Sequence, residues 1–355
     1  MDDSSANFKI LSEPIEEQLS KNQKRRLSKQ RQRVESATIA PTVVESNISA
    51  ESKISPETTE TLAILAAPNV LSASTTLPLT SAIAIERAAA TLNFDRLTTK
   101  PRTSVTVVEG QRMASNDEYF LVCPEGELCL LDTQGNKHRS LKRTFNVSDI
   151  CWSAYLKQFL ILSDEHLYSF DMTRETALMI EISQFARYMD ECTCHDNIFM
   201  VVSDFGGSII EMWDMTKNWQ SIKRYKPPIS RKEGQGICSI RFSSSGAHLG
   251  VTLTEPRIVK AYFQIRNWQD MIVLHTVEQP FYEGYCNHYM LALPKDEFLV
   301  YKYAQKKLSF FHSNGQQKQT IQYAKGVCSV SLVPNDKNCL AIQTSRPDQL
   351  HFYDI

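Results

Sequence analysis

A unit of two apolar strands recurs six times after residue 103, and this repeat constrains the fold more than any other feature of the sequence. Each unit holds an apolar run, a short polar turn and a second apolar run that often ends in Asp. The first runs are residues 119–123, 158–163, 198–203, 248–254, 297–303 and 338–344. Their partners are residues 127–132, 166–171, 208–214, 259–265, 307–313 and 349–355. The units are about 44 residues apart, which is typical of four-stranded β-propeller blades.

Two further strands complete each unit. Inner-strand candidates precede the pairs at residues 148–153, 188–194, 236–243, 286–294 and 326–333. More polar outer strands follow at residues 177–182, 271–277 and 318–323, as expected where one side of a strand faces water. No helical pattern lies between the strands, which argues against a βα solenoid. The sequence therefore predicts an all-β fold, a six-bladed β-propeller over residues 103–355.

The last unit ends at Asp354-Ile355, so no residues remain for its outer strand. A sheet edge left open there would invite unwanted pairing, which proteins normally prevent. The β-branched segment 104–108 precedes the first unit and alternates polar with apolar residues. We expect it to pair antiparallel with residues 350–354 and to close the ring.

One unit also has a recognisable turn. Ser203-Asp204-Phe205-Gly206-Gly207 is followed by Ile209 and then by Trp213-Asp214, which resembles a WD repeat. In that family an Asp-x-Gly turn joins two strands, and the second strand ends in Trp-Asp. Weaker copies are Glu125-Gly126 with Leu131-Asp132, and Asp164-Glu165 with Phe170-Asp171. The resemblance covers residues 103–355, with one close copy, and implies a protein-binding propeller.

Residues 1–100 have a different composition. They contain no Trp, Tyr or Gly, and Phe8 and Phe94 are their only aromatic residues. So few large apolar groups cannot offset the entropy cost of ordering the chain. We expect a disordered tail, rich in Ser and Thr, with helix-prone islands near residues 13–35 and 81–94.

A basic cluster lies in the first island. Seven cations and no acid occur in thirteen residues: Lys21, Lys24, Arg25, Arg26, Lys29, Arg31 and Arg33. The cluster fits a nuclear-import signal, a contact with an RNA or phosphate backbone, or a solvated charged helix. Arg25-Arg26-Leu27-Ser28 also resembles the site of a basophilic protein kinase. A phosphate on Ser28 would add about −1.5 to −2 charge and weaken any anion contact.

A second basic run contains aromatic residues. It comprises Trp219, Lys223, Arg224, Tyr225, Lys226, Arg231 and Lys232. By the repeat count it spans an outer strand and the long loop to the next inner strand. Loops on a rigid scaffold are common binding sites, so this run is a candidate partner loop. The alternative is a solvated loop.

The cysteines and histidines do not form a metal-site pattern. Nine cysteines, an odd number, lie mostly in apolar runs, which indicates reduced thiols and a cytoplasmic or nuclear protein. Cys192, Cys194 and His195 are close in sequence, but neighbouring strand residues point to opposite sides. Cys238 and Cys328 share a register in their inner strands, which suggests small packing positions. The acidic N-terminus lacks the features of a secretory signal, and no run is long enough to span a membrane.

The sequence has no motif for catalysis. It lacks a Gly-x-Ser-x-Gly elbow and a phosphate-binding loop, and its eight histidines are scattered. The net charge of −1 gives no global attraction to nucleic acid or anionic membrane. We therefore expect a non-enzymatic scaffold for protein–protein interactions, of WD-repeat type, without cofactor or metal. The alternatives are an RNA-associated propeller that uses the basic arm, and a propeller hydrolase.

Overall fold

The fold was analysed in a computed structural model. It describes residues 92–107, 112–163, 166–173, 177–180, 188–204, 207–279, 288–334 and 338–355, with the backbone alone at 177–180 and 257. These residues belong to one compact unit, residues 76–355, and the following description concerns this unit. Within it the regular secondary structure of the described residues is β-strand, apart from three short 3₁₀ helices.

Four of the sheets have four strands each, and neighbouring strands within them are antiparallel. The first is β2 (Met113–Ser115), β3 (Tyr119–Val122), β4 (Glu127–Asp132) and β5 (Lys137–Lys142). The second is β6 (Asp149–Ser153), β7 (Gln158–Leu162), β8 (Leu167–Phe170) and β9 (Ala177–Ile180). The third is β10 (Met189–His195), β11 (Ile198–Ser203), β12 (Ile209–Asp214) and β13 (Gln220–Tyr225). The fourth is β14 (Gly236–Phe242), β15 (Leu249–Glu255), β16 (Lys260–Arg266) and β17 (Val273–Gln279).

The fifth sheet has seven strands because one long strand serves both of its halves. It contains β18 (His288–Leu293), β19 (Glu297–Lys302), β20 (Gln305–Phe311), β21 (Gln317–Val333), β22 (Cys339–Ser345), β23 (Gln349–Asp354) and β1 (Thr103–Thr106). The first part of β21 pairs with β20, and its second part pairs with β22. The sequence analysis had treated these parts as two strands, 318–323 and 326–333.

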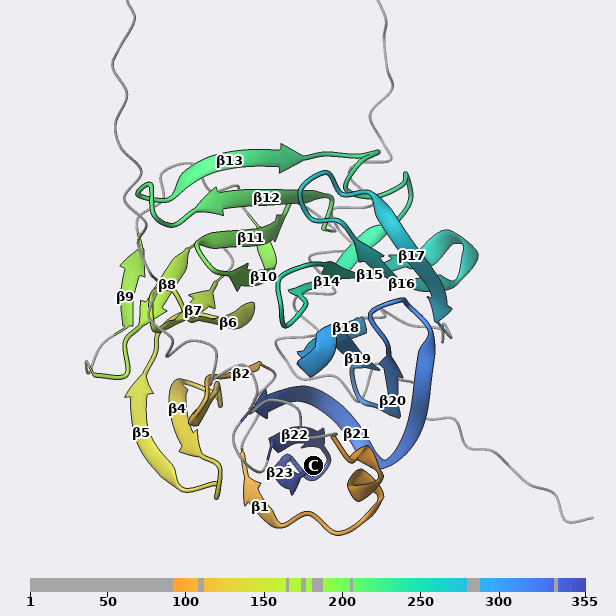
Figure 1. The fold of residues 1–355 in the computed structure, drawn as a ribbon. Helices are drawn as coiled ribbons and strands as arrows, with labels where there is room; N and C mark the ends of the chain where they lie inside the picture. Colours follow the sequence, from red (N-terminus) through yellow and green to blue (C-terminus); the bar gives the residue numbers. More distant parts are fainter. Residues whose placement is uncertain are drawn as a thin grey trace, which may run out of the picture. The chain divides into compact units, whose positions relative to one another are not determined.

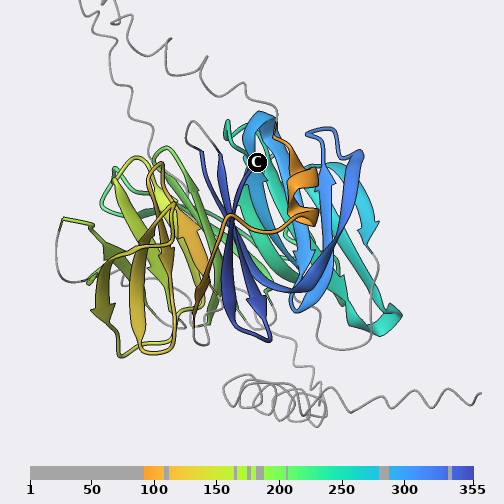
Figure 2. The ribbon, with the colours of Figure 1, turned by 90° about the horizontal axis from the view of Figure 1, so that it is seen from below.

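The sheets surround a common axis. Figure 1 shows β2, β6, β10, β14 and β18 near the centre and β5, β9, β13 and β17 at the rim. Figure 2, viewed at right angles, shows the sheets standing side by side around this axis. The predicted all-β fold of small antiparallel sheets is thus confirmed.

The predicted closure of the ring is also confirmed. β1 pairs antiparallel with β23, so that Thr103 faces Phe352 and Thr106 faces Gln349. Arg102, just before β1, forms an ion pair with Asp354 at the end of β23. The two ends of the domain are therefore joined by backbone hydrogen bonds and by charge.

A short 3₁₀ helix, η3 (Phe94–Thr98), precedes β1 and packs on the same sheet. The side chain of Asn93 caps it by accepting a hydrogen bond from the Asp95 amide at 3.1 Å. Phe94 and Leu97 are buried, and the Phe94 ring lies 4.1 Å from that of Phe310. These residues, assigned to the tail by sequence, are packed against the domain because Phe94 and Leu97 supply apolar area that η3 can bury.

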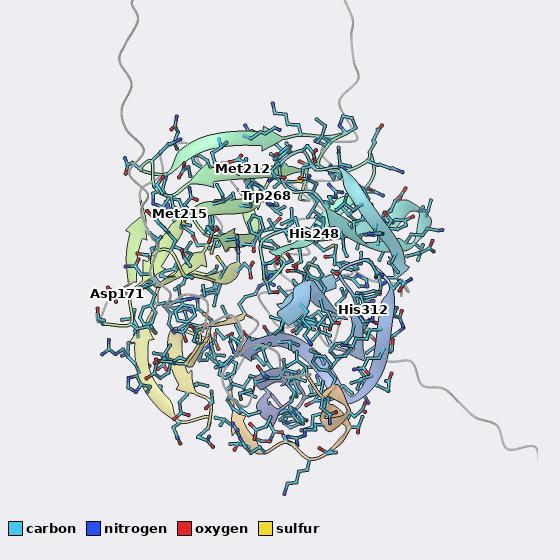
Figure 3. The ribbon with its side chains drawn as sticks, viewed as in Figure 1. Asp171, Met212, Met215, His248, Trp268 and His312 are labelled. Atoms are coloured by element: carbon cyan, nitrogen blue, oxygen red, sulfur yellow. The ribbon has the colours of Figure 1, made fainter. Side chains whose placement is uncertain are left out.

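The apolar core lies in layers between neighbouring sheets. Successive side chains of a strand point to opposite sides, so each sheet contributes to two layers. β12 illustrates this: Met212 packs with residues of β14 and β15, whereas Trp213 and the following Met215 pack with residues of β6 and β7. Figure 3 shows side chains filling these layers, with Met212 and Met215 labelled.

Candidate functional site

Exposed apolar side chains are concentrated on one part of the rim. Among the described residues, nine large apolar side chains are exposed, and seven of them lie between residues 222 and 274. Five of these form what we call the rim surface: Ile222, Ile229, Ile272, Val273 and Leu274. The most exposed are Ile272, at 58%, and Ile229, at 57%. Single exposed apolar residues are ordinary, but a concentration of them marks an interaction site.

Hydrogen bonds bring the elements of the rim surface together. The Tyr225 hydroxyl at the end of β13 donates to the Gln269 carbonyl at 2.6 Å, in the turn between β16 and β17. The Lys223 ammonium donates to the same carbonyl at 3.1 Å and lies 4.8 Å from the centre of the Tyr225 ring. Met271 is buried in the same apolar cluster as Tyr225. Ile222 and Ile272 therefore flank one tightly joined junction between two sheets.

The loop after β13 is also held in place. The Ile229 amide donates to the Lys226 carbonyl at 2.9 Å, and the Ser230 hydroxyl donates to the Ser208 carbonyl. The guanidinium of Arg266, on β16, donates to the Ser230 carbonyl at 2.7 Å. Burial lowers the pKa of Arg266 to about 10. Ile229 is thus presented on a braced loop, which reduces the entropy cost of binding.

The candidate partner loop divides into buried and exposed residues. Tyr225 is buried, and half-buried Trp219 makes an edge contact with Phe199 at 5.5 Å between ring centres. Both aromatic residues therefore pack inside the domain. Lys223, Arg224, Lys226 and Lys232 are exposed, and Arg231 is half-buried. Arg224 forms an ion pair with the buried Glu211 at 3.1 Å, which offsets its charge, and the exposed Lys223 is the cation next to Ile222.

Four ionisable side chains from four different sheets meet near the axis; two acids are buried, and two arginines are partly buried. The Arg241 guanidinium donates a hydrogen bond of 2.9 Å to one carboxylate oxygen of Asp149 and lies 2.9 Å from the other in an ion pair. It also lies 3.3 Å from Glu191, whose other carboxylate oxygen lies 3.1 Å from Arg112. We call these four residues the axial ring. Sequence reasoning missed the ring; its signal was a charged residue within each otherwise apolar inner segment.

Side chains of the axial ring have raised pKa values. Burial, followed by repulsion from Asp149, raises the pKa of Glu191 to about 8, although Arg112 and Arg241 oppose the shift. Burial lowers the pKa of Arg241, but the attraction of Asp149 and Glu191 outweighs it and raises the pKa overall. Arg112 also lies 4.5 Å from the centre of the Tyr289 ring, a cation–π contact. The charges thus partner one another.

A cavity of about 320 Å³ adjoins the ring and is lined by inner-strand residues such as Ser115, Thr193 and Ser331. Asp149, in this lining, is held by Arg241, and the neighbouring Glu191 lies against both Arg112 and Arg241. The arrangement joins the inner segments of four sheets. It acts as a structural clamp.

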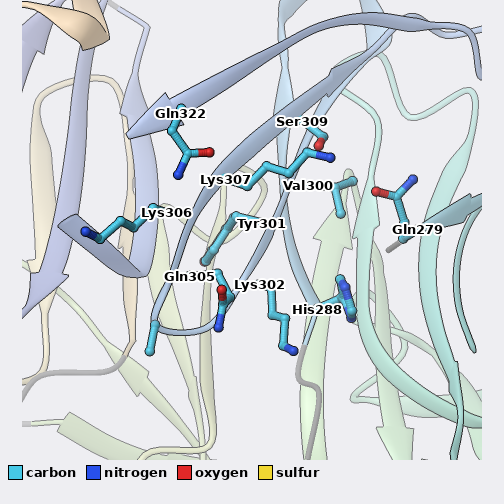
Figure 4. A pocket seen from close by; sticks show the side chains of 11 residues that line it. Gln279, His288, Val300, Tyr301, Lys302, Gln305, Lys306, Lys307, Ser309 and Gln322 are labelled. Atoms are coloured by element: carbon cyan, nitrogen blue, oxygen red, sulfur yellow. The ribbon is translucent and has the colours of Figure 1, made fainter. Parts of the chain in front are cut away.

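A second pocket, of about 280 Å³, is lined by three lysines. Lys302 ends β19, and Lys306 and Lys307 begin β20, so a single hairpin carries all three. We call it the lysine pocket. In Figure 4 Lys302 extends on the side of His288, Lys307 extends toward Ser309 and Val300, and Lys306 extends to the opposite side. This pocket was not found from the sequence because its residues come from five strands.

The thiols and histidines give no metal site in the described residues: no group of three His, Cys, Asp or Glu could hold an ion there. Cys151 lies 3.6 Å from Cys194 and 3.7 Å from Cys192, sulfur to sulfur. Cys238 and Cys328 both lie where the inner strand bulges, between residues 237 and 239 and between 327 and 329. Figure 3 labels His248, just before β15, and His312, just after β20, so the two histidines adjoin different sheets.

Several sequence predictions fall outside the described residues. They are the basic cluster from Lys21 to Arg33, the candidate phosphosite Ser28 and the helix-prone island at 13–35. Most of the island at 81–94 is outside as well. Within the described part of the chain, no helix is both long enough and apolar enough to cross a lipid bilayer.

Comparison with known proteins supports the fold. No family model matches the chain, and no curated protein matches it. Among solved structures, it is similar to a chain of "Crystal Structure of Mitotic Checkpoint Complex", with a TM-score of 0.53 and 13% identity. The match covers 81% of this chain and 99% of that chain. At this identity the likeness supports a β-propeller fold, and it carries no assignment of family or partner.

Proposed function

We propose that the protein is a non-enzymatic interaction propeller that binds a protein partner through its rim surface. In this proposal the domain has six blades, because the seven-stranded sheet counts as two. β18, β19, β20 and the first part of β21 form one blade. The second part of β21, β22, β23 and β1 form the other. The fold serves as a rigid frame for the surface.

The observation that carries the proposal is the concentration of exposed apolar residues on a rigid junction. Ile222, Ile229 and Ile272 are each more than two-fifths exposed, at 47%, 57% and 58%. They lie beside the exposed cations Lys223, Arg224 and Lys226. Apolar groups supply affinity, and complementary charges supply specificity and speed of encounter. The partner that fits is a protein segment that carries apolar side chains next to acidic ones.

The proposal is tested by comparing the partners of two variants. The first, Ile272→Ser with Leu274→Ser, removes apolar area from the rim surface. The matched control, Tyr155→Ser, removes a side chain that is 49% exposed on another sheet. Tagged full-length proteins are used for quantitative affinity purification, and each protein that depends on the rim is then purified and its Kd measured.

We expect at least one partner to bind the wild type and the control alike, and the rim variant about tenfold more weakly or worse, since two truncated apolar contacts are worth more than about 1.4 kcal/mol. Identical partner sets and affinities for the two variants would exclude the rim surface as the binding site.

A further inference from the structure

We propose that Cys151 and Cys194 are a redox modification site, at which a peroxide links the two thiols in a reversible disulfide bond. Cys151 lies on β6 and Cys194 on β10, and these strands belong to different sheets. The contact between the thiols, the cavity beside them and the chemistry of sulfur support the proposal. It does not depend on the rim surface.

The two sulfur atoms are already in contact. They are 3.6 Å apart, although the residues are 43 positions apart in the chain. The Cys194 thiol also donates a hydrogen bond to the Trp152 carbonyl at 3.1 Å, which holds its sulfur against β6. The sulfurs of a disulfide are about 2.05 Å apart, so an approach of roughly 1.5 Å is enough to form the bond.

The two strands are held together beside the thiols. Figure 1 shows β6 and β10 near the axis. The Cys192 amide on β10 donates to the carboxylate of Asp149 on β6 at 2.9 Å. Arg241 binds the same carboxylate and also donates to the Cys192 carbonyl at 2.9 Å. These bonds lie two residues before each thiol, and such positioning favours reaction within the pair over reaction between molecules.

Access to solvent distinguishes Cys194 from Cys192. The Cys192 sulfur is 3.7 Å from that of Cys151, because residues two apart on a strand face the same side. Cys192 is 0% exposed, however, whereas Cys194 is half-buried. Cys151 and Cys194 both line the axial cavity of about 320 Å³. An oxidant in this cavity therefore reaches Cys194 and not Cys192.

The cavity suits a small polar oxidant. Thr193, Ser243 and Ser331 are in its lining and offer hydroxyl groups that donate and accept hydrogen bonds. A water molecule takes up about 30 Å³ in the liquid, and hydrogen peroxide has one more oxygen atom. The volume of the cavity therefore admits hydrogen peroxide, which we take as the oxidant.

In the first step the Cys194 thiolate attacks one oxygen of hydrogen peroxide. The O–O bond breaks and an S–O bond forms, which gives a sulfenic acid on Cys194. The released hydroxide takes a proton from solvent and leaves as water. Hydrogen bonds with Cys192 and Cys194, followed by burial, raise the pKa of Cys151, so Cys151 is the weaker first nucleophile.

In the second step Cys151 attacks the sulfur of the sulfenic acid. The S–S bond forms, the S–O bond breaks, and the thiol proton of Cys151 leaves with the hydroxyl group as a second water. Two thiols and one hydrogen peroxide thus give one disulfide and two waters, with two electrons passed from sulfur to oxygen. The sulfur contact at 3.6 Å compensates for the low nucleophilicity of Cys151.

The test uses hydrogen peroxide on the reduced full-length protein at low protein concentration. Remaining thiols are blocked with N-ethylmaleimide, the protein is digested with trypsin without reduction, and linked peptides are quantified by mass spectrometry. Cys192 and Cys194 fall on one tryptic peptide, since no Lys or Arg separates them. Cys194→Ser and Cys192→Ser therefore identify the sulfur that reacts. The matched control is Cys238→Ser, at a half-buried cysteine of another inner strand, β14.

We expect the wild type to form a link between the peptides of Cys151 and Cys194, and dithiothreitol to remove it. Cys194→Ser should reduce the yield about tenfold or more, because the accessible thiol is lost. Cys192→Ser and Cys238→Ser should change it less than about twofold, since the reacting pair remains in contact. Thermal unfolding in reductant establishes that the variants are folded. If Cys194→Ser is not folded, a link in Cys192→Ser still identifies Cys194.

Three results would overturn the proposal. The first is the absence of the linked peptide from the oxidised wild type, with Cys194 unmodified or converted to a sulfinic acid. The second is a link that persists in folded Cys194→Ser or disappears from folded Cys192→Ser, which would make Cys192 the partner. The third is a disulfide found only between two molecules. None of these results bears on the rim surface, so the two proposals fail separately.

Discussion

The guanidinium of Arg241 holds both carboxylate oxygens of Asp149, at 2.9 Å each, although the two residues are 92 positions apart in the chain. This bond joins β14 to β6, and Glu191 on β10 lies between them within 3.3 Å of the same guanidinium. A charge network at the axis thus connects inner strands that the sequence separates.

Asp149→Asn should destabilise the domain strongly. The substitution removes one charge from a buried pair and leaves Arg241 undercompensated, which costs about 3–5 kcal/mol. Lys260→Gln is the control, because it removes one charge from the solvent-screened pair Lys260–Glu278 and should leave the unfolding midpoint close to that of the wild type. Both are measured by urea unfolding. Equal midpoints for the two variants would show that the axial ring does not stabilise the fold.

Glu191 should make stability fall as pH rises. Its pKa in the folded protein is about 8, against an ordinary value of 4.5, so the folded state holds a proton that the unfolded state has lost between these values. The loss of stability is at most about 1.4 kcal/mol per pH unit in this window.

His351 acts in the opposite direction at lower pH, because burial lowers its pKa from 6.5 to about 4 and favours the neutral form. The stability contributed by neutral His351 is lost as the pH falls from 6.5 toward about 4. The effect of Glu191 is therefore clearest between pH 6.5 and 8. Glu191→Gln should reduce the change of melting temperature with pH over this range, relative to the wild type. An unchanged slope of melting temperature against pH would contradict the assignment.

Removal of the segment before β1 should cost stability in two steps. A chain that starts at residue 91 keeps η3 and should melt like the full-length protein. A start at residue 99 removes Phe94 and Leu97, which are both 2% exposed, and should cost about 3–5 kcal/mol. A start at residue 110 also removes β1 and leaves the edge of β23 open, which should cause aggregation. Calorimetry and light scattering follow these effects; identical melting of all three chains would refute the packing and the closure.

Two glycines in equivalent turns should respond differently to alanine. Gly207 and Gly126 both have positive φ, +62° and +73°, so each substitution carries backbone strain of about 1 kcal/mol. At Gly207 the new Cβ would also lie 2.3 Å from the Ile237 carbonyl oxygen, whereas nothing lies within 4 Å at Gly126. Gly207→Ala should therefore lower the melting temperature several degrees more than Gly126→Ala. Equal shifts of the melting temperature would show that β14 moves away from the new Cβ at little energetic cost.

The strand pairs could be predicted closely because their pattern is local. The apolar runs predict strands at residues 127–132 and 198–203. These ranges match β4 and β11 at both ends. β21 could not be predicted as one strand, because Ala324, Lys325 and Gly326 read as a break. The backbone remains extended there, and Gly326 pairs with Ser345.

The candidate sites were less accessible from sequence. Lys223, Arg224 and Lys226 were selected for their charge, but the exposed Ile272 and Leu274 come from a different sheet and have no pattern of their own. The axial ring and the lysine pocket gather single residues from several strands. A repeat search finds the residues that recur in each sheet. The residues of these sites do not recur, so the search passes over them.

The pairing of β1 with β23 also sets the order of events during synthesis. Arg102 and Asp354 are 252 residues apart, so the first strand of the domain is made long before its partner. At about 5–20 residues per second, the ribosome needs roughly 10–50 s to complete the interval. During this time β1 has no partner within the domain. The last step of folding therefore waits until β23 has left the ribosome, and a chain that stalls before β23 is made leaves β1 without its partner.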